Sequence, residues 1–396
     1  MTCQCNGSDQ AFAVSSRGLP NACGVAVLLC FILAGCASPT GIKFTEPSLT
    51  GLDTETVLVA TSRSPDELVR ADFSGKRDEK LHFSSYDVSI PPSHKTGEIE
   101  WPRGDKPDIK RHFAVTMAKD IPVESGFLAA LNARMTMEAR SEKASQREVI
   151  LFVHGYNTDF SESLYRAAQM KHDFKLQAPL ALFSWPSSGK TTDYLYDRDS
   201  VKVSRDKLAS VIELLSRTKA QAVTLVAHSM GSELLMESLR QIALENHGNL
   251  PKKLKTIILI SPDLDVDVFN NQLDAIKTLP ADFVLFVSES DRALKLSSRL
   301  AGDNTRVGNT IDITKFKRKG IAVIDVTDFT DGDAMNHMSV ATSPSLVSLF
   351  KGFAGSMHGD LMLAPGEQIS LSDQVIDTAT LPITLVVRTT KTILNP

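Results

Sequence analysis

The most telling absence is that of cysteine: all five cysteines fall within the first 36 of 396 residues. Disulfide bonds and cysteine-ligated metal ions are therefore excluded as supports for the body of the chain. The chain also lacks any excess of basic residues, because 43 Lys and Arg stand against 47 Asp and Glu. No nucleic-acid partner is expected from this balance.

The sequence also lacks the motifs of metal and nucleotide enzymes. It contains no H-E-x-x-H, no cysteine cluster and no glycine-rich phosphate loop of the dinucleotide type. We therefore expect no metal ion and no organic cofactor. A content of 42% hydrophobic and 23% charged residues predicts a globular protein and excludes general disorder, collagen and coiled coil.

One apolar run, residues 22–33, is too short for a membrane span of ~20 residues but typical of a signal-peptide core. It ends in Leu33-Ala34-Gly35-Cys36, which resembles the bacterial lipobox. The resemblance implies that residues 1–35 are a lipoprotein signal peptide and that Cys36 is lipidated and becomes the mature N-terminus. The alternative is that Cys36 is a small apolar residue at the end of a signal or anchor helix.

Residues 36–50 are then an anchor and linker, and the lipid chains on Cys36 attach the protein to a membrane. Ala37 stands where an aspartate would signal retention in the inner membrane of Gram-negative bacteria. The expected location is thus the periplasmic face of the outer membrane. Since the segment before the apolar run has Arg17 as its single cation, a start of translation further along is an alternative.

Beyond residue 50, strand-like and helix-like segments alternate, which is typical of an α/β fold with a mostly parallel sheet and helices on both faces. An antiparallel pair is expected to open a sheet of about eight strands. The strands are expected at 56–62, 80–90, 148–153, 179–185, 222–227, 256–260, 283–287 and 321–326. Helices are expected at 161–176, 200–217, 230–245 and 346–353. Continuous apolar, β-branched runs indicate strands that are buried on both faces.

One domain, residues 51–355, accounts for these elements, and residues 356–396 form a C-terminal extension to which we assign no role. The extension contains one strand candidate, 381–388. The turn residues of 91–122 predict a loop that drapes over the sheet edge. The basic residues 315–319 are interpreted as a solvated loop or, alternatively, as a contact for anionic headgroups.

A candidate nucleophile lies where a buried strand gives way to a helix. Ala227-His228-Ser229-Met230-Gly231 matches the nucleophile elbow G-x-S-x-G, with alanine in place of the first glycine. The turn needs small residues because the serine adopts a strained conformation. By its sequence and position, this elbow resembles that of an α/β-hydrolase, which implies that Ser229 is the catalytic nucleophile.

The resemblance extends to a second loop. His154-Gly155-Tyr156-Asn157 follows a strand and precedes a helix, which is the place of the oxyanion loop in this fold. The fold implies that backbone N–H groups of Met230 and of Tyr156 or its neighbour Gly155 form the oxyanion hole. The side chain of His154 is expected to pack or hydrogen-bond beneath the loop.

The order Ser, acid, His that the fold implies places the general base after the last strand, where His337 fits. His228 is the competitor by adjacency, but we expect its side chain to point away from the pocket. His358 is a further alternative beyond the last helix.

The acid is expected at a strand end between Ser229 and His337, where its carboxylate can fix the imidazole. Asp291 occupies the family's usual site, Asp263 follows the preceding strand, and Glu289 is the remaining candidate. Asp291 is therefore the predicted acid, and Asp263 is the alternative.

Further segments narrow the resemblance to a bacterial branch of the esterase/lipase superfamily described as a domain of unknown function. They are Thr61-Ser62-Arg63, residues 89–97, Phe183-Ser184-Trp185-Pro186, Ser261-Pro262-Asp263-Leu264-Asp265 and Arg306-Val307-Gly308. The resemblance covers residues 50–355 and implies hydrolase chemistry without naming a substrate.

The leading hypothesis is an envelope-anchored serine hydrolase that cleaves carboxylic esters through an acyl-enzyme. Only about twenty residues separate the sixth and seventh strands, so no large cap domain is expected, which favours small or accessible acyl-ester substrates. Thioesterase, amidase or acyltransferase chemistry on the same triad is one alternative. A non-catalytic envelope scaffold or binding lipoprotein on the same fold is another.

Overall fold

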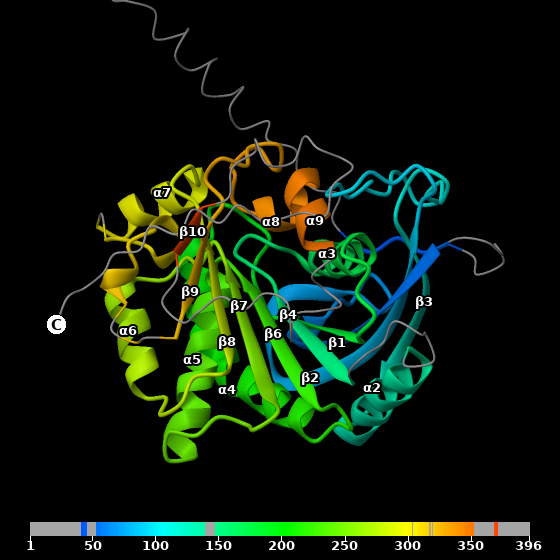
Figure 1. Cartoon of the computed structure of the whole chain (residues 1–396). Helices are drawn as coiled ribbons and strands as arrows, with labels where there is room; N and C mark the ends of the chain where they lie inside the picture. The colour runs from blue at the N-terminus through cyan, green and yellow to red at the C-terminus, as the bar shows by residue number, and fades with distance from the viewer. Residues whose placement is uncertain are drawn as a thin grey trace, which may run out of the picture. The chain divides into compact units, whose positions relative to one another are not determined.

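The computed structural model describes residues 41–45, 53–138, 147–302, 304–316, 318, 320–351 and 368–370 (Figure 1). The expected signal peptide, Cys36, His358 and the strand candidate 381–388 lie outside these residues.

The described strands form one ten-stranded, mostly parallel sheet in the order β10-β9-β8-β7-β6-β4-β5-β1-β2-β3. The strand bounds are β1 Asp53–Pro65, β2 Phe73–Ile90, β3 Ala114–Ile121, β4 Glu148–Val153, β5 Leu180–Ser184, β6 Ala222–His228, β7 Leu254–Ile260, β8 Asp282–Val287, β9 Ala322–Asp325 and β10 Gln368–Ser370. The eight expected strands are all present, and β3 and β10 are additional. The α/β-hydrolase fold class is therefore confirmed.

The antiparallel opening of the sheet is confirmed as well. β1 pairs antiparallel with β2, and on its other side it pairs parallel with β5. Treating all of residues 91–122 as loop was wrong, because β3 pairs antiparallel with β2 and extends this edge. The proline- and glycine-rich residues around β3 conceal a short strand, and Val115 in this strand also exchanges backbone hydrogen bonds with Lys43 and Thr45.

Helices cover both faces of the sheet (Figure 1). Helices α2, α4, α5 and α6 pack on one face, and α3, α8 and α9 pack on the other. Their bounds are α2 Glu124–Glu138, α3 Phe160–Asp173, α4 Tyr194–Ser216, α5 Met230–Glu245, α6 Val266–Asp274, α7 Arg292–Leu300, α8 Ser339–Thr342 and α9 Pro344–Lys351. None of the helices in the described part of the chain is long and apolar enough to cross a membrane.

Each face of the sheet has its own hydrophobic core, because the central strands bury side chains on both sides. In β6, Leu225 joins the core under α4 and α5, whereas its neighbour Val226 joins the core under α3. Between β7 and β8 the chain forms only α6, so this segment holds no cap domain.

Ion pairs and hydrogen bonds hold the loop that precedes β3 against α3. The His94 ring lies between two carboxylates, with Nδ1 2.8 Å from Glu100 and Nε2 2.9 Å from Asp173. Burial lowers the pKa of His94, but the hydrogen bonds and charges of Asp173 and Glu100 outweigh it and raise this pKa to about 9. The Asp173 carboxylate also accepts from the N–H of Gly97. The loop therefore lies against α3.

The basic residues 315–319 are described only in part. Arg318 donates to the carbonyl oxygens of Ile276 at 2.8 Å and Lys277 at 3.0 Å, just beyond the end of α6. Arg318 thereby holds this segment against the chain that follows α6.

Candidate active site

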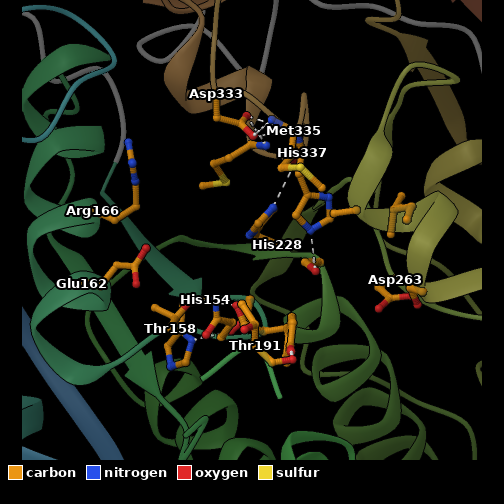
Figure 2. Close-up of a pocket in the computed structure, with 18 of the residues that line it drawn as sticks. His154, Thr158, Glu162, Arg166, Thr191, His228, Asp263, Asp333, Met335 and His337 are labelled. Carbon is orange, nitrogen blue, oxygen red and sulfur yellow. Dashed lines mark hydrogen bonds between the residues drawn. The ribbon is translucent and has the colours of Figure 1, made fainter. Parts of the chain in front are cut away.

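A cavity of about 460 Å³ lies where the parallel strands end at their carboxyl edge (Figure 2). Its lining comes from the loop after β4, from α3 and α7, from the elbow after β6, and from the loop between β9 and α8. Ser229, His337 and Asp263 are among the lining residues. Ligands of open α/β sheets bind at this edge, because the loops that follow the strands meet there.

Ser229 occupies a strained turn between β6 and α5. Its backbone has φ 52° and ψ −128°, a conformation that costs a residue with a side chain about 1–3 kcal/mol. Gly231 allows the turn, because a Cβ at this position would lie 2.2 Å from the carbonyl oxygen of His154. The elbow is therefore wedged against the end of β4.

The loop after β4 brings backbone directly beside Ser229. A Cβ on Gly155 would lie 2.9 Å from Cβ of Ser229 and 2.6 Å from Nδ1 of His228, so no larger residue fits without a shift. Further along the loop, the N–H groups of Asn157 and Thr158 donate to the side chains of Asp197 and Ser187. Those two N–H groups are already used, so the Gly155–Tyr156 segment and Met230, at the first position of α5, stay the predicted oxyanion donors.

The side chain of His154 lies in packing beneath this loop, as expected. It is buried and stacked on Trp185, with ring centroids 5.1 Å apart and planes 7° apart. Burial and the nearby Arg63 guanidinium lower the pKa of His154 well below its ordinary value. A neutral ring in this place supports the loop.

His337 connects the serine to an acid. Its Nε2 lies 2.8 Å from Oγ of Ser229, and its Nδ1 lies 2.7 Å from Oδ2 of Asp291. The carboxylate assigns the ring proton to Nδ1, which leaves Nε2 to accept from the serine hydroxyl. The structure thus brings Ser229, His337 and Asp291 together in one hydrogen-bonded chain.

Asp333 is a site residue that the sequence analysis missed. Its carboxylate accepts from the N–H groups of Met335, His337 and Met338 and so fixes the loop that carries the histidine. The signal was the Asp331-Gly332-Asp333 run, since aspartate side chains commonly bond to backbone N–H groups a few residues on.

The alternative acids lie elsewhere. Asp263 accepts from Oγ of Ser297 at 2.6 Å and lies 3.3 Å from Nε of Arg306, so its charge is already matched inside the cavity wall. Glu289 is exposed on the loop that follows β8. Neither carboxylate contacts the imidazole of His337.

The expectation that His228 points away from the pocket was wrong. His228 lines the cavity, and its Nε2 lies 3.1 Å from the carbonyl oxygen of His337 (Figure 2). The missing side chain of Gly155 leaves room for this ring beside the nucleophile. Burial first, and the charge of His337 second, lower the pKa of His228 well below its ordinary value. His228 thus supports the backbone of His337 through this hydrogen bond.

Opposing effects set the pKa of His337. Burial lowers this pKa. The charge of Asp291, its hydrogen bond to the ring, and the more distant charges of Asp263 and Asp333 together raise the pKa by more than burial lowers it. The net result is a pKa above the ordinary value of 6.5. The imidazole is therefore a stronger proton acceptor than a free histidine.

One group in the described part of the chain has the spacing of metal ligands: His94, His172 and Asp173, with ligand atoms within 4.8 Å of one another. Both ring nitrogens of His94 already face carboxylates, and its raised pKa keeps the ring protonated. An imidazolium offers no lone pair to a metal ion. The group is better explained as an ion-pair cluster, and none of its members lines the cavity.

Sequence comparison identifies a family. The family described as alpha/beta hydrolase of unknown function (DUF900) matches residues 129–352, which is more than half of the chain. An uncharacterised protein from a Nostoc species is 29% identical over 164 residues, which cover 34% of this chain and 42% of that protein. The match thus spans less than half of the length of this relative.

Among solved structures, a dienelactone hydrolase from Anabaena variabilis aligns at 11% identity and a TM-score of 0.36, covering 72% of this chain and 94% of that one. Carboxyl esterase 2 from the fungus Tuber melanosporum aligns at 11% identity and a TM-score of 0.35, covering 84% and 98%. At such low similarity these neighbours say nothing about the substrate of this chain.

The geometry predicts how the pKa of His337 responds to loss of the acid. Asp291→Asn should lower this pKa below that of the parent protein, because the charge and the acceptor are lost while burial remains. NMR titration of the Cε1–H signal of the His337 ring measures the shift. Asparagine still caps α7, so the helix should persist.

Asp263→Asn is the matched control in the same cavity wall. It should lower the pKa of His337 less, since Asp263 acts only through its charge at a distance. A larger shift in Asp263→Asn than in Asp291→Asn would contradict the assignment of Asp291 as the partner.

Proposed function

The chain belongs to the alpha/beta-hydrolase family of unknown function (DUF900), and we propose that it is a serine hydrolase that cleaves carboxylic esters through an acyl-enzyme. One observation carries the proposal: the hydrogen-bonded chain Ser229–His337–Asp291 opens onto a cavity. A nucleophile, a base and an orienting acid in this order are the arrangement that acyl transfer requires.

In the first half-reaction, Oγ of Ser229 attacks the ester carbonyl carbon while Nε2 of His337 takes the hydroxyl proton. The carbonyl π electrons move to oxygen and give a tetrahedral oxyanion. When the oxyanion collapses, the bond to the alkoxy group breaks and His337 returns the proton to the leaving alcohol. Asp291 stays ionised and stabilises the imidazolium in between.

In the second half-reaction, water takes the place of the alcohol. His337 removes a proton from the water as the water oxygen attacks the acyl carbon. When the tetrahedral intermediate collapses, the bond to Oγ of Ser229 breaks and His337 returns the proton to Ser229. Backbone N–H groups of Met230 and of Gly155 or Tyr156 would donate to the oxyanion in both steps, each contributing ~3 kcal/mol. The strained turn at Ser229 supports its role as nucleophile, because the turn fixes the serine before substrate arrives.

The first prediction of this function is covalent labelling. A fluorophosphonate probe should label the parent protein and leave Ser229→Ala unlabelled, because the probe reacts with an activated serine hydroxyl. Gel fluorescence after denaturation measures the label. An unlabelled parent, or equal labelling of both proteins, would leave a non-catalytic scaffold as the better description.

The second prediction concerns the base and its pH dependence. His337→Ala should reduce kcat/KM on a short-chain nitrophenyl ester by ~10³-fold or more while the fold is kept. In the parent, kcat/KM should fall on the acid side as His337 becomes protonated. The half-loss point should lie above pH 6.5, since the folded protein raises this pKa.

Asp291→Asn and Asp263→Asn, assayed side by side, complete the test. Asp291→Asn should approach the loss of His337→Ala, and Asp263→Asn should keep most of the activity. Equal mild losses would show that neither carboxylate orients the base.

The proposal includes attachment to the envelope through lipidated Cys36, at the periplasmic face of the outer membrane. The lipobox-like Leu33-Ala34-Gly35-Cys36 supports it. Cells grown with radioactive palmitate should incorporate label into the protein, and Cys36→Ser should abolish it. Retention of label in Cys36→Ser would rule out this anchor.

A further inference from the structure

The exposed face of α7 has an unusual composition. All five of its exposed residues, Arg292, Lys295, Leu296, Arg299 and Leu300, are either basic or leucine. Leu296 is 54% exposed and Leu300 is 65% exposed, one helical turn apart. We call these five residues the α7 face. It presents three cations and two large apolar side chains and no acid.

The cations of the α7 face are free of ion pairs within the described structure. No carboxylate of the described residues lies within 4.0 Å of the charged atoms of Arg292, Lys295 or Arg299. The chain as a whole carries a formal charge of −4, so this face opposes the overall sign. Among the residues that the structure describes, the positive charge of this face therefore has no acidic partner.

The α7 face is continuous with the mouth of the cavity. Leu296 and Leu300 line the cavity although they are exposed, which places them at its rim. Met335, 41% exposed, also lines the cavity, and the N–H of Arg292 donates to its carbonyl oxygen at 3.0 Å. Figure 1 shows α7 and α8 at the same edge of the sheet. Anything that covers this face therefore meets the entrance to Ser229.

We propose that the α7 face docks the mouth of the cavity onto an anionic lipid surface. Leucines that project outward beside cations suit such a surface, because the apolar side chains enter the acyl boundary while Lys and Arg meet the headgroups. In the core of a protein–protein interface lysine is depleted, whereas Lys295 stands directly beside Leu296 on this face. Docking would let an ester substrate pass from the lipid layer to Ser229, a consequence that rests on the proposed function.

The test is local quenching of a tryptophan placed in the α7 face. Leu296→Trp is introduced into full-length Ser229→Ala protein, so that lipid hydrolysis cannot alter the vesicles. With vesicles of phosphatidylglycerol that carries brominated acyl chains, the emission added by this tryptophan should fall by about half. Vesicles of brominated phosphatidylcholine should leave it unchanged. A local probe reports the α7 face whether or not another segment attaches the chain to the vesicle.

Two controls complete the design. Leu244→Trp is the matched position, because Leu244 is also 54% exposed but lies near the end of α5, away from the edge at which α5 begins. Its emission should not change. Adding Lys295→Glu and Arg299→Glu to Leu296→Trp should abolish the quenching. Circular dichroism checks that each variant is folded.

Absence of quenching in Leu296→Trp would overturn the inference, as would equal quenching of Leu244→Trp or quenching that survives the two charge reversals. These outcomes are independent of catalysis. A parent protein that reacts with the fluorophosphonate but does not dock disproves only the docking, and a protein that docks but does not react disproves only the hydrolase.

Discussion

The carboxylate of Asp291 is the group on which the site depends. It is buried, its Oδ2 lies 2.7 Å from the imidazole of His337, and its Oδ1 accepts the N–H of Leu294 at 2.9 Å. One oxygen thus orients the base and the other caps α7. A buried carboxylate is costly unless both oxygens have partners, and here the two partners are the imidazole of His337 and helix α7. The position of α7 and the orientation of His337 are therefore set together.

The backbone conformation of Ser229 depends on close packing around it. Ser229 has a positive φ that the surroundings must enforce. Gly155, in the loop after β4, lets that loop approach Ser229, and Gly231, in α5, lets the helix approach the end of β4. At both positions an added Cβ would fall within 3.0 Å of neighbouring atoms. The same packing that strains the serine keeps it facing the cavity, so the hydroxyl is in place before any substrate binds.

The sequence was most informative where one physical cause dominates. The central strands were predictable because burial on both faces demands continuous apolar runs, and Ser229 because its small neighbours stand at a strand-to-helix junction. The sequence favoured Asp291 over Asp263 only through the family's usual site, since each carboxylate follows a strand end. That choice depends on Arg306 and Ser297, which come together with Asp263 only in the folded chain. His228 was misjudged because strand alternation ignores the space that Gly155 leaves beside it.

The double role of Asp291 also constrains how α7 could serve an interface. A helix that swings open like a lid would pull its N-terminal cap away, and the cap is the same carboxylate that fixes the imidazole. Motion of α7 would then remove the contact that orients the imidazole of His337. The arrangement instead favours a rigid α7 whose exposed residues meet a surface while its buried end holds His337. The outward-facing and inward-facing contacts of α7 belong to different sides of the helix. The helix can therefore bind a partner without disturbing Ser229, His337 and Asp291.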